Sequence, residues 1–532
     1  MHSLIARSDE DSEVLPHFIR NSCQRAGETV AWLITLSFFA TPLQPATASE
    51  PNKDIRKPIA DSSTHPPTGA ISPDTFWGVG PLVHAYAIPR GAASCAATAC
   101  HGGPSVAVAA ADAVRGSEYP LFVESDPHSR SWRTLNSPLS IEILTKLGIL
   151  RNGAIANPTA YQNCLACHNT DRSLSPDRIT PNIAEGVGCE SCHGPSEAWY
   201  DSHYQGPQSV LASKSERGMI DTKPLLQRAR TCTLCHVGAA DRDMNHDIIA
   251  AGHPALYFDM AVYHEAYPKH WRDPEADAPA FRAQLWLAGQ IAKADAELEL
   301  LQTRAAKAHS VSVWPEFAQF RCTSCHNTLD GLPLEPEKPR ALGAIDWEAL
   351  GRASVRRWNL QGIQTLVESP RENHEPNWDF RGEPATMLSA LLTELNSPNA
   401  PQGTIAQKAG ELRPILASRA VDVMANRSRR TLAQQRSIAA AQLRQAIDSK
   451  DWEDASLAYI ATWAALPRSV PASAVPAAIE SDMDTARAGL VFPFRSQSPR
   501  FPRSDASSAP PTRQQWDAAI ERILLFIESV EP

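Results

Sequence analysis

The sequence has few of the residues that build large sheets, and it carries no excess of positive charge. Its 532 residues include 26 glycines against 43 prolines, and only 7% of them are aromatic. This composition predicts long irregular connections rather than an extended sheet. Lysine and arginine number 50 against 59 aspartates and glutamates, so the formal net charge is −9. A nucleic-acid-binding function is therefore not expected, because such domains usually carry a basic patch.

Long hydrophobic runs are also lacking. The strongest candidate, Thr29–Leu43, is too short to span a bilayer comfortably. It follows Arg20 and Arg25 and precedes small residues ending at Ala48, a pattern that predicts a secretory signal over residues 1–48. The protein is then periplasmic or otherwise exported. Acidic residues before the run leave an uncleaved membrane anchor as the alternative, and only that alternative would bring the chain into contact with a membrane.

Cysteine is absent after Cys325 and, apart from Cys23, occurs only in pairs. In every pair the second cysteine is followed directly by a histidine, in the stretches "CAATACH", "CLACH", "CESCH", "CTLCH" and "CTSCH". The pairs are Cys95 with Cys100, Cys164 with Cys167, Cys189 with Cys192, Cys232 with Cys235, and Cys322 with Cys325.

The pattern C-x-x-C-H is the attachment signature of c-type haem, in which two thiols bind the vinyl groups and the adjacent histidine binds iron. A zinc site needs four ligands but has no reason to place a histidine after the second cysteine every time. A disulfide framework needs no histidines, and a thioredoxin-like dithiol would occur once. The recurrence therefore predicts haem c.

The first motif differs from the others, because four residues rather than two separate Cys95 from Cys100. We expect the longer spacer to loop across the haem edge, which gives five covalently attached haems; the alternative is a four-haem protein with a stray cysteine pair. The iron ligands expected from the motifs are His101, His168, His193, His236 and His326. Because His168 and His193 are only 25 residues apart, we expect the second and third haems to pack closely.

A six-coordinate haem iron needs a second axial ligand, so histidines outside the motifs are candidates. His128 follows Pro127 at the start of a helix that Ser125 or Asp126 could cap. His203 is a further candidate, because it lies soon after the third motif. His246 and His253 are candidates seven residues apart, around a helix expected to end at Gly252. In the next segment, His270 is preferred over His264.

Other side chains are weaker candidates for the iron. His84 is a reserve ligand for the first haem, and no ligand role is expected of His65, His309 and His374. Met244 and Met260 lie in the histidine-rich segment, but their expected role is to fill the core.

The stretches "SDPHSRSW", "CLACHNT", "GVGCESCHGP" and "NHDIIAAGHPAL", in this order after a divergent first motif, resemble the cytochrome c554 and c-prime family, also described as cytochrome c-552/4 domains. The resemblance is specific over residues 90–205 and looser to about residue 330. It implies a mostly helical, loop-rich domain of stacked haems with two histidine ligands each, which passes electrons in the periplasm. It also implies His101, His168 and His193 as motif ligands, and His128 and His203 as the opposite ligands. The five motifs exceed the family's four, and the long C-terminal region has no counterpart there.

The expected fold is therefore mainly α, with a loop-rich multihaem cytochrome domain followed by a haem-free helical domain. A helix over residues 278–308 should lead to the fifth motif, and further helices are expected near 346–357, 384–397, 403–424, 428–449, 451–465 and 512–530. The predicted divisions are a signal peptide 1–48, a linker 49–89, the multihaem domain 90–330, a helical domain 331–494, a linker 495–513 and a terminal helix 514–532.

The expected function is electron transfer between redox protein partners by an exported pentahaem cytochrome. The first alternative is an oxidoreductase that acts on a small nitrogen or sulfur compound at an iron with an open position; no C-x-x-C-K motif is present to mark such a haem. The second alternative is a haem-bearing subunit of a respiratory complex. The sequence leaves the enzyme question open and favours the carrier.

Overall fold

Helices dominate the computed structural model, which confirms the expected mainly α fold. The structure describes residues 89–103, 116–171, 185–204, 217–307, 314–322, 325, 355–368, 380, 382–397, 401–425, 431–449, 451–466, 475–490 and 511–530. The predicted signal peptide lies outside these residues. No described helix has both the length and the apolar character needed to cross a membrane.

The motif-bearing part of the chain consists of short helices and turns. Within the described residues, its one sheet is a hairpin of two strands with two residues each. The tight turn between them, at Asn152 and Gly153, has positive φ angles of 51° and 77°. The elements are η2 (Ala92–Cys95), α3 (Glu118–Ser125), η3 (Pro127–Arg130), α4 (Ser131–Thr134), α5 (Pro138–Lys146), β1 (Leu150–Arg151), β2 (Ala154–Ile155), α6 (Pro158–His168), α7 (Cys189–His193), η5 (Ser196–Ala198), α9 (Leu225–His236), α10 (His246–Ala251) and α11 (Met260–Ala266).

This part has little apolar core of its own before α9. One small cluster of buried side chains lies around α5 and α6. Its buried members are Leu135, Leu144, Ile149, Tyr161 and Leu165. Such a cluster is small for the length of chain around it, so further interactions are needed to hold the turns in place.

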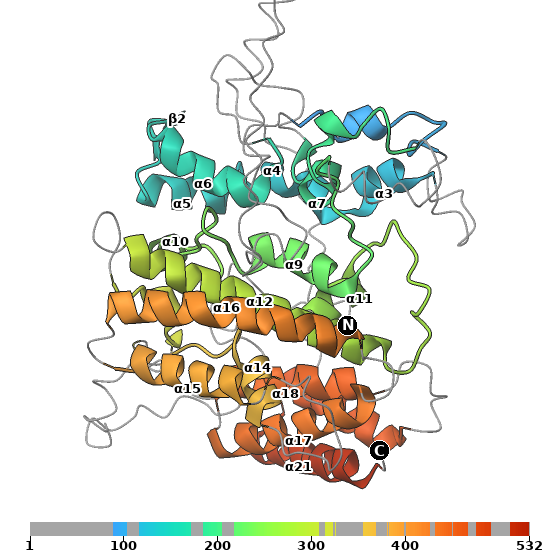
Figure 1. Cartoon of the computed structure of the whole chain (residues 1–532), viewed down its shortest axis with the longest axis vertical. Helices are drawn as coiled ribbons and strands as arrows, with labels where there is room; N and C mark the ends of the chain where they lie inside the picture. The colour runs from blue at the N-terminus through green and yellow to red at the C-terminus, as the bar shows by residue number, and fades with distance from the viewer. Residues whose placement is uncertain are drawn as a thin grey trace, which may run out of the picture. The chain divides into compact units, whose positions relative to one another are not determined.

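The long helix α12 (Phe281–Lys307) is the centre of the larger core. It contacts α9 and α11 before it in the chain and α14, α16, α17 and α18 after it; Figure 1 shows α16 running beside α12. The helix expected over residues 278–308 is present, but it is more than a connection to the fifth motif, since 20 of its 27 residues are buried. Alanines and paired polar side chains, which an apolar stripe does not reveal, complete the buried surface.

The C-terminal helices are α14 (Gln361–Glu368), α15 (Glu383–Leu395), α16 (Gln402–Ala425), α17 (Thr431–Ser449), α18 (Trp452–Ala465), α19 (Ala477–Gly489) and α21 (Arg513–Ser529). Five agree closely with the predicted segments, whereas α14 and α19 were not predicted. The helix expected near 346–357 is wrong at its described end, where Val355 forms a β-bridge with Phe320. One hydrophobic cluster runs from Leu225 to Ile527 and unites these helices with α9, α11 and α12.

A buried charge cluster fixes α9, the helix that ends in the fourth motif, to α12 and α16. The Asp295 carboxylate on α12 accepts a hydrogen bond from Arg230 of α9 at 2.7 Å and from Arg413 of α16 at 3.0 Å. All three side chains are buried. Removing one member would leave an uncompensated buried charge, so the cluster specifies how α9 sits on the core.

The contact of α11 with α12 depends on a glycine. A Cβ atom at Gly289 would lie 2.5 Å from the Cβ of Met260. We expect Gly289→Ala to lower the free energy of unfolding by about 1 to 3 kcal/mol through overpacking. The control is Gly403→Ala in α16, where no atom lies within 4 Å of the added carbon; it should be neutral or stabilise by up to about 1 kcal/mol. Denaturant unfolding of both variants tests this, and equal midpoints would contradict the close packing.

Candidate haem-binding site

Three of the five motifs lie at the C-terminal end of a helix. The helices α6, α7 and α9 each end on the motif histidine, namely His168, His193 and His236. In a helix, residues three and four positions apart share a face. The two cysteines and the histidine of C-x-x-C-H therefore point to the same side of the chain, as attachment to one flat ring requires.

The first motif has a different local structure. Its first cysteine ends the 3-10 helix η2, and the chain then turns through residues 98–101. A four-residue spacer would place Cys95 and Cys100 on different faces of a continuous helix, so a loop is needed to bring them together. Among the ten described cysteines of the motifs, none is joined in a disulfide.

Eight of the predicted histidine ligands form four pairs in the structure, and each pair combines one motif histidine with one histidine from elsewhere in the chain. We name the pairs in the chain order of their motifs. The first pair is His101 with His203 at 6.2 Å between ring centroids, the second is His168 with His253 at 6.3 Å, the third is His193 with His270 at 6.3 Å, and the fourth is His236 with His128 at 6.1 Å.

These spacings fit two imidazoles bound to opposite sides of one metal ion. With metal–nitrogen bonds of about 2 Å, the centroids of two such rings lie about 6 Å apart. A direct hydrogen bond between ring nitrogens would bring the centroids to about 5 Å. The donor set therefore fits an iron with two axial imidazoles in each pair, the ligation typical of low-spin haem.

The outward-facing ring nitrogen of several ligands is held by an acceptor. Nδ1 lies within hydrogen-bonding distance of a backbone carbonyl in His168, His203 and His253, at 2.7 to 3.0 Å. A carbonyl can only accept, so Nδ1 carries the proton and Nε2 keeps its lone pair for a metal. Carboxylates take the same position in two other ligands, at His101 with Glu118 and at His128 with Asp126.

The electrostatics of the pairs also favour neutral imidazole at most positions. Burial lowers the pKa of His193 and of His236 to about 4. Burial likewise lowers the pKa of His168, His253 and His270. A metal binds only the unprotonated ring, so these sites are ready for ligation at neutral pH.

His101 is the exception among the four described motif histidines. Its hydrogen bond with Glu118, 3.2 Å long, raises its pKa. Its side chain is 43% exposed, and the neighbouring Cys100 is exposed too. The first pair is thus the one most open to solvent at its motif, and Tyr204, next to His203, is 71% exposed.

Contacts between motifs link the first, third and fourth pairs in that order. The Cys95 thiol of the first motif lies close enough to the Cys189 thiol of the third that this neighbour lowers the pKa of Cys95 to about 7. The other cysteine of the third motif, Cys192, interacts electrostatically with Cys232 of the fourth. Between these two pairs lies Tyr267, whose ring centroid is 5.8 Å from that of His128 and 6.4 Å from that of His270.

The fourth pair is linked in turn to the second. The Cys235 sulfur lies 4.0 Å from the Ala166 carbonyl oxygen, inside the second motif, and Arg242 donates to the same oxygen at 2.9 Å. The expected closeness of the second and third motifs is supported by several hydrogen bonds of Thr170, which lies two residues after His168. Its hydroxyl lies 2.7 Å from that of Ser191 and accepts from the Gly188 N–H at 2.7 Å, and its own N–H donates to the Gly186 carbonyl at 2.9 Å. The cysteine contacts place the first and fourth motifs beside the third as well.

The short helix α10 lies between the second pair and the fifth motif. It begins at His246 and, as predicted, ends at Gly252, whose φ of 124° stops the helix before His253. The backbone N–H of His246 donates to Glu316 at 2.8 Å, and its ring lies 5.7 Å from that of Phe317. These contacts bring His246 to the segment that runs into the fifth motif. His326 lies outside the described residues.

Cys322 of the fifth motif lies against the C-terminal helices. Its thiol interacts electrostatically with Tyr257, whose ring lies 5.0 Å from that of Trp452 in α18. The preceding Arg321 forms ion pairs with Asp451 and Asp454 at 3.2 and 2.9 Å. The start of α18 therefore anchors the chain where it enters this motif.

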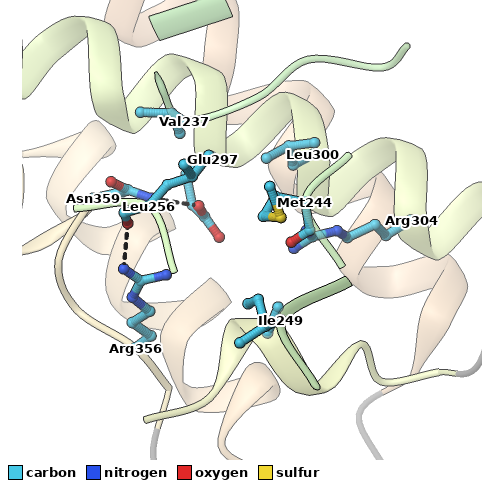
Figure 2. A pocket seen from close by; sticks show the side chains of 10 residues that line it. Val237, Met244, Ile249, Leu256, Glu297, Leu300, Arg304, Arg356 and Asn359 are labelled. Atoms are coloured by element: carbon cyan, nitrogen blue, oxygen red, sulfur yellow. Dashed lines mark hydrogen bonds between the residues drawn. The ribbon is translucent and has the colours of Figure 1, made fainter. Parts of the chain in front are cut away.

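The alternatives to these ligands lie elsewhere. His264 is buried, with Nε2 3.0 Å from both Asp273 and Arg228, so it belongs to a structural ion cluster. Met260 is buried in the core, and Met244 lines a small cavity with Ile249, Leu300 and other residues (Figure 2). The positions His65, His84, His309 and His374 lie outside the described residues.

Two glycines of "GVGCESCHGP" lie where the protein backbone leaves no room for a side chain. A Cβ at Gly186, where φ is 66°, would lie 2.5 Å from the His128 carbonyl oxygen, and one at Gly194, where φ is 80°, would lie 2.2 Å from that of Gly218. The close approach of two backbone segments therefore requires a glycine at both positions.

Sequence reasoning missed two acidic partners of the ligands. Asp126 was expected only as a helix cap, and it does accept from the backbone N–H of His128, but the same oxygen also binds the imidazole. Its place two residues before His128 was the available signal. Glu118 is 17 residues from His101 in the sequence, and no local pattern indicated that the two side chains would meet.

The repeated motif and the paired histidines together define a multihaem c-type cytochrome. Residues 96–194 match the family model described as Cytochrome c554 and c-prime, which confirms the resemblance over this segment. No curated protein and no solved structure matches the chain. The matched segment begins one residue after Cys95, so it contains the rest of the first motif, the whole second and third motifs and His128. The fourth and fifth motifs and the C-terminal helices lie beyond it.

The pairing of His193 with His270 can be tested by substitution of His270, with a substitution of the nearby His264 as the control. We expect His270→Ala to remove one axial ligand, so one low-spin haem becomes high-spin in the absorption and EPR spectra of the oxidised protein. His264→Gln should leave every haem low-spin while it lowers stability, because it disturbs the buried contacts with Arg228 and Asp273. Conversion to high spin in the His264 variant alone would show that the pair is wrongly assigned.

Proposed function

We propose that the protein is an exported pentahaem c-type cytochrome that transfers electrons between redox protein partners. The observation that supports this most strongly is the formation of four separate pairs from eight histidines, each pair joining a motif to a distant residue. Two protein ligands at one iron leave no open position for a substrate. This favours a carrier over an oxidoreductase that binds a small nitrogen or sulfur compound.

The cofactor residues in this proposal are the ten motif cysteines, which would form the thioethers, and ten histidines, which would bind iron. The motif ligands are His101, His168, His193, His236 and His326, and the opposite ligands are His203, His253, His270, His128 and His246. Haem c, when bound, supplies reversible one-electron chemistry at iron.

The chain's own residues arrange and tune these sites. Carbonyl and carboxylate acceptors at Nδ1 fix the orientation and tautomer of the ligands. Contacts between motifs set the order first, third, fourth, second. The exposed first motif, with Cys100 at the surface, is the end of this order that a partner protein can approach.

For the fifth site we propose that His246 supplies the second axial ligand. The support is its position beside Glu316 and Phe317, on the segment that leads into Cys322. Because α10 has His246 at its start and His253 just after its end, this helix would join the fifth site to the second pair. The fifth site then forms the other end of the order.

The haem count and the spin state test the proposed function. A pyridine haemochrome assay should give five haems per chain, and EPR of the oxidised protein should show only low-spin iron. A count of four would contradict the role of one motif, that of Cys95 and Cys100 being the most divergent. A high-spin signal that shifts on addition of nitrite, hydroxylamine or cyanide would contradict the pure carrier.

The fifth ligand has its own test. We expect His246→Ala to keep five haems and to convert one of them to high spin, since its cysteines are untouched. The matched controls His309→Ala and His374→Ala should leave the spectrum unchanged. The assignment of His246 is wrong if one of these controls produces the high-spin signal instead.

Export follows from the N-terminal pattern, which we propose is a signal peptide cleaved after Ala48. Haem attachment to all five motifs in an exported chain needs no membrane segment in the mature protein. The proposed partners are soluble or membrane-bound redox proteins, with no role for nucleic acid.

A further inference from the structure

His128 differs from the other described ligands because a buried carboxylate accepts a hydrogen bond from its ring. The Asp126 carboxylate is buried, with 3% of the residue exposed. One of its oxygens lies 2.9 Å from Nδ1 of His128 and 2.9 Å from the backbone N–H of the same residue. The other oxygen accepts from the hydroxyl of Tyr267.

The other ligands for which an acceptor at Nδ1 is described have weaker acceptors. Neutral backbone carbonyls accept from His168, His203 and His253. Glu118 does bind His101, but at the longer distance of 3.2 Å and with its side chain 23% exposed, against 4% for Asp126. Solvent screens a charge at the surface and screens a buried one much less.

A buried carboxylate at Nδ1 changes the metal ligand in two ways. It draws the Nδ1 proton toward itself, which makes the imidazole a stronger donor at Nε2. Its negative charge also opposes the addition of an electron nearby, and in a low-dielectric site this effect is larger. Both effects favour the oxidised iron.

We propose that Asp126 is a positioning residue that gives the haem of the fourth pair the lowest reduction potential among those of the four pairs. The inference rests on the proposed function, since it requires iron between His128 and His236. In the order of the pairs, the fourth lies between the third and the second. The lowest potential would then fall inside the series, and the fourth haem would be the last of the four to accept an electron.

Tyr267 provides a second, independent test of the effect of Asp126. Its hydroxyl donates to the Asp126 oxygen that does not face His128, and this hydrogen bond withdraws part of the negative charge from the imidazole. Removing the hydroxyl should therefore strengthen the effect of Asp126. The two residues are expected to shift the potential in opposite directions.

The experiment is a spectroelectrochemical titration of the full-length holoprotein, followed by EPR. Asp126→Asn should shift the oxidised-to-reduced ratio of one haem at least tenfold toward reduced, which is 59 mV upward for a one-electron couple. Tyr267→Phe should move the same haem in the opposite direction. The affected EPR signal should be the one that becomes high-spin in His128→Ala.

Glu118→Gln is the matched control, because it removes the other carboxylate that faces a ligand. It should move a different haem, and by less than Asp126→Asn does. The proposal is overturned if Asp126→Asn leaves every potential unchanged, if all haems shift equally, or if both variants at the fourth pair shift it the same way. If Asp126→Asn fails to fold, the sign of the Tyr267→Phe shift still decides. A haem count below five in the unmodified protein would instead contradict the proposed function.

Discussion

The spacing of the histidine pairs is the constraint on which the motif-bearing half of the chain depends. Two imidazoles whose centroids lie about 6 Å apart are too far apart for a direct hydrogen bond, and their spacing fits a metal ion bound between them. This half has short helices, a two-residue hairpin and one small apolar cluster. We propose that ligation through the four pairs supplies the cross-links that its core does not, joining segments as distant as His128 and His236.

The C-terminal helices complete the molecule in a different way. Their apolar side chains share one cluster with α9 and α12, so the fourth motif is part of that core rather than of a separate layer. The Asp295 cluster orients α9, and Asp451 and Asp454 hold Arg321 next to the fifth motif. The helices that lack motifs therefore position two of the five motifs, which gives this part of the chain a structural reason for its length.

The motifs are read directly from the sequence, and the mainly α fold and most long helices were predicted from it, because local patterns determine these features. It also gave eight histidines that the structure brings together, but their pairing depends on contacts between remote segments. The buried state of α12 was missed because Lys293 and Asp295 are hidden by pairing, not by apolar character. At Val355, the described end of another expected helix, a bridge with the remote Phe320 takes the place of helical structure, which local preference does not reveal.

The central claim is that each histidine pair binds one iron, in the order first, third, fourth, second, with His246 at the fifth site. The most direct test is the crystal structure of the holoprotein, with iron located by anomalous scattering. We predict five iron sites, four of them between the rings of the named pairs, with the iron of the fourth pair next to those of the third and second. The proposed ligation is contradicted if the two histidines of any of these four pairs do not bind the same iron, or if His264 binds an iron in place of His270.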